Sequence, residues 1–235
     1  MRARGFCVHP SVNNPSRVRF MLQGWASPTS QQGFAMWFLK KPSAEQIRNF
    51  LAAQSQQVFS YPEVGCSRGL TPPGYDLDRN RVSLGKGTAV FEAACSAIRQ
   101  WQMFCTPWTE IHPADTPIQP KNTVAVLAHV FGLWCINSCR IVYVVNETEP
   151  VRRFGFAYGT LSSHVERGEE RFTVEWDHDD IVWYDMRAFS QPQHLLVRLG
   201  YPLARRLQKR FVVASQAAMR QAVANIFTPG NGGQI

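Results

Sequence analysis

The stretch from residue 152 to residue 189 constrains the fold most, because its residues alternate in character with a period of two. Glu170, Phe172, Val174 and Trp176 fall on one parity, and the residues between them fall on the other. This period is typical of a half-buried β-strand whose apolar set faces the core. We predict three consecutive antiparallel strands, over 152–161, 165–176 and 181–189.

Glu170 shares the parity of the apolar residues of its strand, so its carboxylate is expected to point into the interior. A charge in that environment is unfavourable unless it is paired, protonated or solvated. Two interpretations stay open. Glu170 either has a structural role, tied to an arginine such as Arg140 or to backbone donors, or it holds a ligand hydroxyl or amine in a functional site.

The run 123–145 is apolar enough to suggest a transmembrane helix, but it contains His129, Asn137 and Arg140 and is rich in β-branched residues. We interpret it as two strands rather than as a membrane span. Ser43 and Gln46 stand at capping-box spacing and predict the start of a short helix. Further elements are predicted as a strand over 79–84, a helix that follows Gly87 and a long helix over about 195–224.

The long C-terminal helix has an apolar stripe at helical spacing. Its predicted members are Leu203, Leu207, Phe211, Ala214, Ala218 and Ala222. The basic residues fall on the opposite side of the helical wheel, where we expect a solvated face. The alternative is a weak electrostatic contact with an anionic membrane through Arg205, Arg206, Lys209 and Arg210.

The net charge of +8 over 235 residues is unevenly distributed. Residues 1–35 and 194–225 carry basic residues and no acidic ones, so the body of the chain is nearly neutral. A high isoelectric point with this distribution does not predict a specific nucleic-acid binder. We therefore expect no nucleic-acid partner.

The six cysteines are scattered, and a chain with this many hydrophobic residues can form a stable core without disulfide bonds. We predict free thiols, no metal site and no cofactor. Residues 1–35 are expected to form a poorly ordered extension, either a transit-like segment or the product of a misplaced start codon. Residues 36–225 are expected to form a single domain and residues 226–235 a flexible tail. The predicted location is cytoplasmic, or an organelle or envelope if residues 1–35 are a targeting segment.

The element order predicts an α+β fold in which a curved antiparallel sheet of about six to seven strands wraps around the long C-terminal helix, with small helices near the N-terminus. Such a helix-grip arrangement commonly leaves a cavity between sheet and helix, which suits a small molecule. The candidate ligand-binding residues are Glu170, His164, Tyr158, Tyr184, Arg140, Phe172, Trp176 and Phe156.

Many short motifs spread over residues 36–224 resemble the uncharacterised family of unknown function DUF1990, which includes bacterial proteins and a plant chloroplast outer-envelope pore protein. The residues that carry the resemblance are Pro42-Ser43 with Ile47, Phe59-Ser60-Tyr61, Asn80-Arg81-Val82 with Leu84-Gly85-Lys86-Gly87, Trp101-Gln102-Met103-Phe104, Arg140-Ile141-Val142-Tyr143-Val144, Tyr158-Gly159-Thr160-Leu161 with His164, Gly168-Glu169-Glu170-Arg171-Phe172, Val182-Trp183-Tyr184, Phe189-Ser190-Gln191-Pro192 and Leu199-Gly200-Tyr201-Pro202. The resemblance implies a fold similar to the helix-grip superfamily of lipid-transfer proteins and polyketide cyclases, and it implies no catalytic residue set.

Three function classes follow. The first is a pocket protein that binds a small apolar or amphipathic ligand. The second is an enzyme of the cyclase or hydratase type that uses Glu170, with His164, as general acid and base. It ranks lower because no nucleophile–base pair accompanies the carboxylate. The third is a pore-forming or membrane-associated protein, which the plant relative implies.

Overall fold

Seven strands form one antiparallel sheet in the order β2-β8-β7-β6-β5-β4-β3, and β1 pairs with β5 outside this path. The computed structural model describes residues 36–69, 72–193 and 200–227, all of which belong to the unit Gln32–Ile235; the other unit, Met1–Gln31, lies outside the described residues. The strands are β1 (Met36–Phe38), β2 (Asp76–Lys86), β3 (Thr109–His112), β4 (Thr123–Val130), β5 (Leu133–Glu147), β6 (Arg152–Thr160), β7 (Glu166–Trp176) and β8 (Ile181–Pro192). The helices are α1 (Ala44–Gln54), α2 (Thr88–Arg99) and α4 (Tyr201–Phe227), with short 3₁₀ turns η1 (Cys66–Arg68) and η2 (Gln102–Phe104).

The predicted α+β class is confirmed, and the three strands predicted over 152–189 are β6, β7 and β8. The capping box of Ser43 and Gln46 opens α1 as expected. Residues 123–145 fall in β4 and β5 rather than in a helix. The extension predicted for residues 1–35 lies outside the described residues. The predicted tail lies there only from residue 228, because α4 continues through residues 226 and 227.

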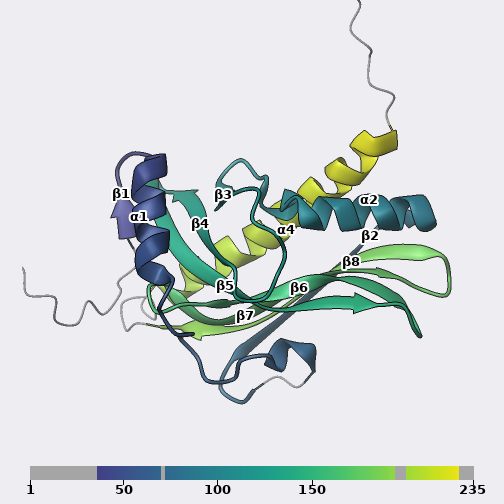
Figure 1. Ribbon diagram of the computed structural model, residues 1–235, viewed down its shortest axis with the longest axis horizontal. Coiled ribbons are helices and arrows are strands. Elements are labelled where there is room, and N and C mark those ends of the chain that lie inside the picture. The colour runs from purple at the N-terminus through teal and green to yellow at the C-terminus, as the bar shows by residue number, and fades with distance from the viewer. Residues whose placement is uncertain (1–35, 70–71, 194–199, 228–235) are drawn as a thin grey trace, which may run out of the picture. The chain divides into compact units, whose positions relative to one another are not determined.

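Helices α2 and α4 lie on the same side of the sheet, which we call its inner face (Figure 1). Helix α2 places Phe91, Ala94 and Ile98 on one face at helical spacing, and all three are buried. From the sheet they meet fully buried residues such as Phe156 and Phe172. Full burial of one such side chain contributes about 1.5–3 kcal/mol to folding, so this layer is a main source of stability.

The face with which helix α4 packs matches the predicted one in part, because Phe211 and Ala222 pack against the core. Ser215, Met219 and Val223 are its most buried residues, with 0%, 0% and 3% of their surface exposed. Leu203, expected in the apolar stripe, is 44% exposed. The predicted stripe is therefore right for Phe211 and Ala222 and wrong for Leu203, and it missed the most buried line of the helix. The Tyr184 hydroxyl and Ser215 Oγ lie 2.9 Å apart, a hydrogen bond that accounts for a buried serine at the centre of the contact.

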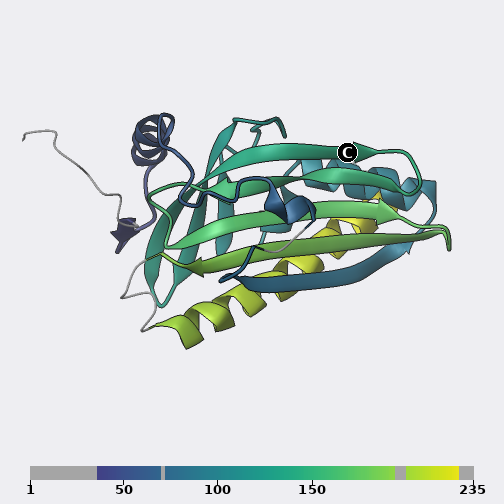
Figure 2. The same ribbon diagram turned by 90° about the horizontal axis from the view of Figure 1, so that it is seen from below.

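The opposite, outer face of the sheet is crossed by the segment 59–69, which contains η1 (Figure 2). This segment is fastened to Glu169 of β7, a residue only 2% exposed. The hydroxyl of Tyr61 and the backbone N–H of Gly65 donate to Oε2 at 2.8 and 2.7 Å. The N–H and hydroxyl of Ser67 donate to Oε1, the first at 3.1 Å. Four donors on one buried carboxylate offset the unfavourable free energy of desolvating it.

The five cysteines in the described part of the chain are free thiols, as predicted for them: Cys66, Cys95, Cys105, Cys135 and Cys139.

Within the described ranges, no helix is long and apolar enough to cross a membrane. The pore alternative stays a prediction.

Gly159 of β6 gives the segment 59–69 room to dock. A Cβ at this position would lie 2.8 Å from Tyr61 Cζ and closer still to the hydroxyl oxygen that binds Glu169. We expect Gly159→Ala to lower the free energy of unfolding by about 1–3 kcal/mol, because the Tyr61 ring is displaced from the carboxylate. Chemical denaturation measures this change.

A double-mutant cycle with Tyr61→Ala tests the cause. In the Tyr61→Ala background the obstructing ring is absent, so Gly159→Ala is expected to cost clearly less than in the wild type. An equal loss of stability in both backgrounds would show that Gly159 acts through something other than Tyr61.

Candidate functional site

A cavity of about 570 Å³ lies between the inner face of the sheet and α4. Its wall is mostly apolar and comes from η2, from strands along the whole sheet and from α4. Representative apolar lining residues are Phe104, Val126, Met186, Leu207 and Phe211. One part of the wall is polar and acidic, and it includes Asp78, His164, Glu166, Glu170 and Gln208.

Glu170 lies in this wall and points inward, as the parity of its strand predicts. The Tyr158 hydroxyl donates to Oε2 at 2.9 Å, and this is the one hydrogen bond that Glu170 accepts from described residues. Burial raises the pKa of Glu170 from 4.5 to about 7; the Tyr158 hydrogen bond opposes the rise, and the charges of Glu166 and Asp78 add to it. Glu170 is therefore a carboxyl with free acceptor capacity that titrates near neutral pH.

Glu166 and Asp78 fasten α4 to the sheet beside Glu170. The Nε2 of Gln208 donates to both Glu166 oxygens at 2.7 and 2.8 Å, and Arg205 donates to Asp78 Oδ1 at 2.7 Å. Arg205 also donates to Gln208 Oε1 at 2.6 Å, so the four side chains form one continuous network. Burial raises the pKa of Glu166, which Gln208 and Arg205 partly offset. The network gives the polar wall a fixed geometry.

His164 lines the cavity, but its Nδ1 lies 3.0 Å from the backbone nitrogen of Glu166, within the turn that leads into β7. Burial lowers its pKa from 6.5 to about 4. His164 is therefore a neutral imidazole at pH 7, and its contact with its own loop orients the ring.

Of the eight residues predicted for the site, Glu170, His164 and Tyr158 line the cavity. Phe156, Phe172 and Tyr184 are fully buried in the core instead. Phe172 packs against a residue of the cavity wall, since the ring centroids of Tyr158 and Phe172 lie 5.4 Å apart.

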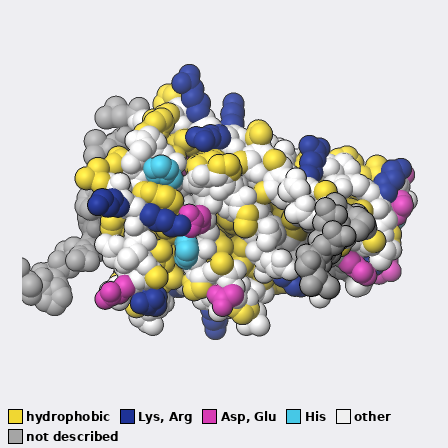
Figure 3. Space-filling model, turned by 90° about the horizontal axis from the view of Figure 1, so that it is seen from above, with side chains coloured by type: hydrophobic (Ala, Val, Ile, Leu, Met, Phe, Trp, Pro, Cys, Tyr) yellow, Lys and Arg dark blue, Asp and Glu magenta, His cyan; other side chains and the backbone are white. Residues whose placement is uncertain are grey.

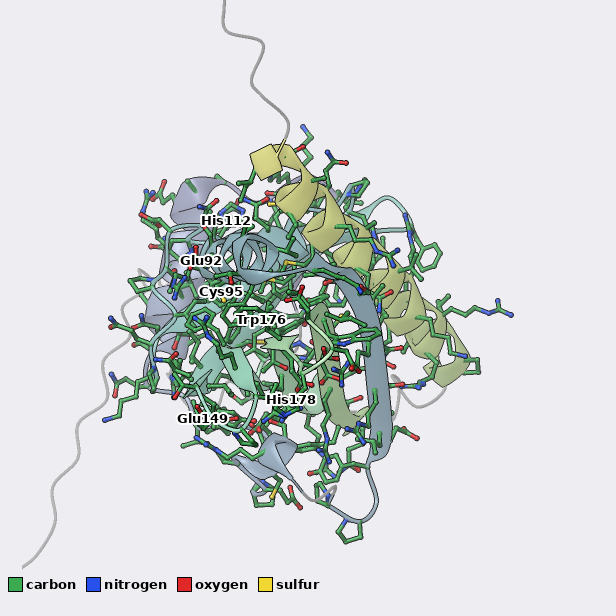
Figure 4. The ribbon with its side chains drawn as sticks, turned by 90° about the vertical axis from the view of Figure 1, so that its right-hand side faces the viewer. Glu92, Cys95, His112, Glu149, Trp176 and His178 are labelled. Atoms are coloured by element: carbon green, nitrogen blue, oxygen red, sulfur yellow. The ribbon has the colours of Figure 1, made fainter. Side chains whose placement is uncertain are left out.

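Two predicted site residues lie elsewhere. Trp176 lies near Glu92 and Cys95 of α2, with its ring centroid 6.0 Å from that of Phe91 (Figure 4). Arg140 is on the outer face, where its guanidinium donates to the backbone oxygens of residues 54, 55 and 57 and to the hydroxyl of Thr123. A pair between Arg140 and Glu170 was therefore a wrong interpretation.

Sequence reasoning missed Glu166, Asp78 and Gln208. Glu166 could have been found, because it continues the parity of Glu170 back along the same strand. Asp78 and Gln208 gave no such signal. Their place in the wall depends on how β2 pairs with β8 and on the phase of α4, neither of which is a local property.

The face of the domain that carries α2 and α4 shows hydrophobic and basic side chains next to each other (Figure 3). The predicted solvated basic face of α4 is wrong for Arg205, which pairs with Asp78. Arg210 lies with its guanidinium 4.9 Å from the Trp108 ring centroid, while Arg206 and Lys209 are exposed. Contact of these four residues with an anionic membrane stays a prediction. In the described part of the chain, no group of three or more His, Cys, Asp or Glu residues could hold a metal ion.

Comparison with known proteins gives consistent matches along most of the chain. A family model described as Domain of unknown function (DUF1990) matches residues 60–218. A UPF0548 protein of Dictyostelium discoideum is 34% identical over 209 residues, which cover 81% of this chain and 97% of the relative. A UPF0548 protein of Deinococcus radiodurans is 37% identical over 188 residues, covering 74% and 92%. Among solved structures, a hypothetical protein from Helicobacter pylori matches with a TM-score of 0.44 and 12% identity, covering 72% of this chain and 96% of that one.

The raised pKa of Glu170 predicts a pH dependence of stability. Because the folded state holds a proton that the unfolded state releases, the free energy of unfolding contributed by Glu170 falls as the pH rises from 4.5 to about 7. Glu170→Gln is expected to remove this loss of stability, because a glutamine does not ionise as the pH rises. We expect the variant to be more stable than the wild type by about 1–3 kcal/mol at pH 8 and unchanged at pH 4.5. Urea denaturation across this pH range measures the difference.

Glu175→Gln, on the outer face of the same strand, is the matched control. Although burial raises the pKa of Glu175, Arg153 and Arg81 lower it below 4.5 overall. Its carboxylate therefore stabilises the fold above that pH, so this variant is expected to lose stability at pH 8. A pH profile of Glu170→Gln that runs parallel to that of the wild type would contradict the inward, poorly solvated carboxyl.

Proposed function

The chain belongs to the DUF1990 family, and we propose that it binds a small amphipathic molecule in the cavity between the sheet and α4. The cavity volume of about 570 Å³ lies in the range of pockets that hold drug-sized molecules, about 300–1,000 Å³. Pockets of this class combine an apolar wall with a few polar groups that orient the ligand.

One observation carries this proposal: the difference between the two adjacent glutamates of β7. Glu169 accepts four hydrogen bonds from the protein and has its capacity filled. Glu170 accepts one, from Tyr158, and faces the cavity. A carboxyl held in a protein interior with unused acceptor positions is unfavourable for stability unless something else binds it. A ligand donor is the partner that we propose.

The charge of the wall favours a particular head group. Glu170 and the Glu166–Gln208 pair lie at the same polar part of the cavity, so a hydroxyl or an amine finds acceptors there, and an anionic group is repelled. The apolar body of the ligand would lie along Met186, Phe104 and Phe211. The proposed ligand is therefore apolar at one end and a hydrogen-bond donor at the other.

Native mass spectrometry of protein purified without detergent tests the proposal. We expect a retained non-protein mass that is lost in Glu170→Ala, because the ligand head group loses its acceptor. Ala188→Leu gives an independent test. Ala188 is the cross-strand partner of Glu170 and lines the cavity, so a larger side chain there occupies the space beside the carboxyl.

Glu175→Ala is the control, because it removes a carboxylate from the same strand on the opposite face. The proposal would be overturned if the wild-type protein carried no ligand mass, or if Glu170→Ala and Ala188→Leu retained as much of that mass as the wild type does. Thermal unfolding of each variant confirms that a lost mass does not reflect a lost fold.

The value of the Glu170 pKa supports acid–base catalysis in the same cavity as a second candidate. A carboxyl that titrates at about 7 can both accept and donate a proton at neutral pH, as a cyclase or hydratase requires. The predicted partner His164 is neutral at pH 7 and held by its own loop, and Tyr158 is the residue that donates a hydrogen bond to Glu170.

Once the retained ligand is identified, turnover separates binding from catalysis. If Glu170 is the acid and base, Glu170→Gln is expected to retain the ligand and to slow its conversion by about a hundredfold or more. The rate of the wild type should follow the titration of a group near pH 7. Slow background conversion that is equal in both proteins would leave binding as the function.

A further inference from the structure

Three arginines stand in one line across the outer face of the sheet, opposite the cavity. Arg171 of β7 is the cross-strand partner of Arg187 of β8, and Arg187 is the partner of Arg79 of β2. Cross-strand partners lie with their Cβ atoms about 4.5–5.5 Å apart and their side chains on the same face. We call these three residues the arginine row.

Like charges placed directly opposite each other destabilise a sheet. The structure offers the arginine row little compensation. Arg171 has Asp185 as an ion-pair partner at 3.3 Å, and Arg187 donates to the backbone oxygen of Gly69. Among the described residues, Arg79 is exposed and makes neither a hydrogen bond nor an ion pair. Within the described ranges, Asp185 is therefore the carboxylate that pairs with Arg171, and Arg79 has none.

The donors of the row are also not all used. Arg171 Nε is buried and has no hydrogen-bond partner among the described residues. The pKa of Arg187 is lowered, mainly by burial and to a smaller extent by the charges of Arg171 and Arg79. A buried donor without an acceptor and a set of repelling cations are both relieved by the same event, the binding of an anion.

A fourth guanidinium borders the row at the end that lies toward β5, still on the outer face of the sheet. The line of cross-strand partners continues from Arg171 through Ala157 to Tyr143 of β5. Arg68 of η1 lies with its guanidinium 3.8 Å from the centroid of the Tyr143 ring. Ala157 is fully buried and separates Arg171 from Tyr143 along this line, so Arg68 borders the row beyond it.

We propose that the arginine row binds the phosphoryl groups of a phosphorylated small molecule. A guanidinium presents two parallel donors that match phosphate oxygens, and a phosphoryl group carries up to two negative charges and three acceptor oxygens. A carboxylate brings one charge and two oxygens, so it neutralises less of the row. A pyrophosphate or a bisphosphate meets the charge of several adjacent guanidiniums at once.

The surroundings limit the anion to a compact one. On one side of the row lies the carboxylate of Asp185, and on the other lies Glu169 beneath η1. Each of the two flanking positions therefore carries a carboxylate, which favours a small polyphosphate over an extended polyanion. The site is on the face opposite the cavity, so this inference is independent of the proposed ligand pocket.

Isothermal titration with inorganic pyrophosphate, on the full chain at low ionic strength, tests the site. We expect saturable binding that weakens at least about tenfold in Arg79→Gln and in Arg187→Gln, since each removes charge-assisted hydrogen bonds. Arg81→Gln is the matched control. Arg81 lies on the same strand and the same face as Arg79 and bears the same charge, but it pairs with Glu175 at 2.7 Å.

Thermal unfolding gives a second readout that does not depend on the titration. Pyrophosphate is expected to raise the melting temperature of the wild type and of Arg81→Gln but not that of Arg79→Gln. Without pyrophosphate, Arg79→Gln should be at least as stable as the wild type, because a repulsion is removed.

The site would be overturned if neither free pyrophosphate nor the vesicles described below bound saturably. Equal weakening in Arg79→Gln and Arg81→Gln would also overturn it, because the effect would then be one of net charge. Phosphoryl groups also occur in phospholipid headgroups, so flotation with vesicles that contain a phosphatidylinositol phosphate is a second arm. Vesicle binding that is lost in Arg79→Gln, with no binding of free pyrophosphate, would support the row and assign its phosphoryl group to a lipid.

Discussion

The register of β7 against β6 and β8 is the constraint on which the rest of the domain depends. Residues of a strand alternate between faces, so a slip of one residue would exchange Glu169 with Glu170 and would move Arg171 from the outer face to the cavity. Two glycines oppose such a slip. Gly159 leaves room for Tyr61 above it, and a Cβ on Gly168 would run into the carbonyl oxygen of Phe189. Close approaches that only glycine allows therefore fix one register.

Local pattern predicted the strands and the inward direction of Glu170, because period two depends only on neighbouring residues. It did not predict that Glu169, on the opposite parity, is buried as well. That burial comes from Tyr61, which is 108 positions away in sequence, and from the η1 turn. Parity shows which face a residue occupies, but not whether a distant segment covers that face.

Helix α4 illustrates a second limit. A search for apolar residues at helical spacing selects Leu203, Leu207, Phe211 and three alanines. Phe211 does pack against the core, yet the most buried line runs through Ser215 and Met219. Two polar features set the phase of the helix: the Ser215 hydrogen bond with Tyr184, and the network of Arg205 and Gln208 with acidic residues of the sheet. Because polar partners from the sheet are known only after the fold, the phase could not be derived from hydrophobicity alone.

Both unusual charge arrangements in the domain meet on β7 within two residues. The carboxyl of Glu170 faces a mostly apolar cavity, and Arg171 is the first of three cross-strand arginines on the other face. Glu169, between the cavity and η1, shows that the same strand can satisfy a charged group completely when the group is structural. Local rules of a fold are expected to be broken at functional or strained positions, where the loss of stability is compensated elsewhere in the fold. The contrast between Glu169, which accepts four hydrogen bonds, and Glu170 and Arg171, which keep unused hydrogen-bonding capacity, is the reason that we place both proposed sites on this strand.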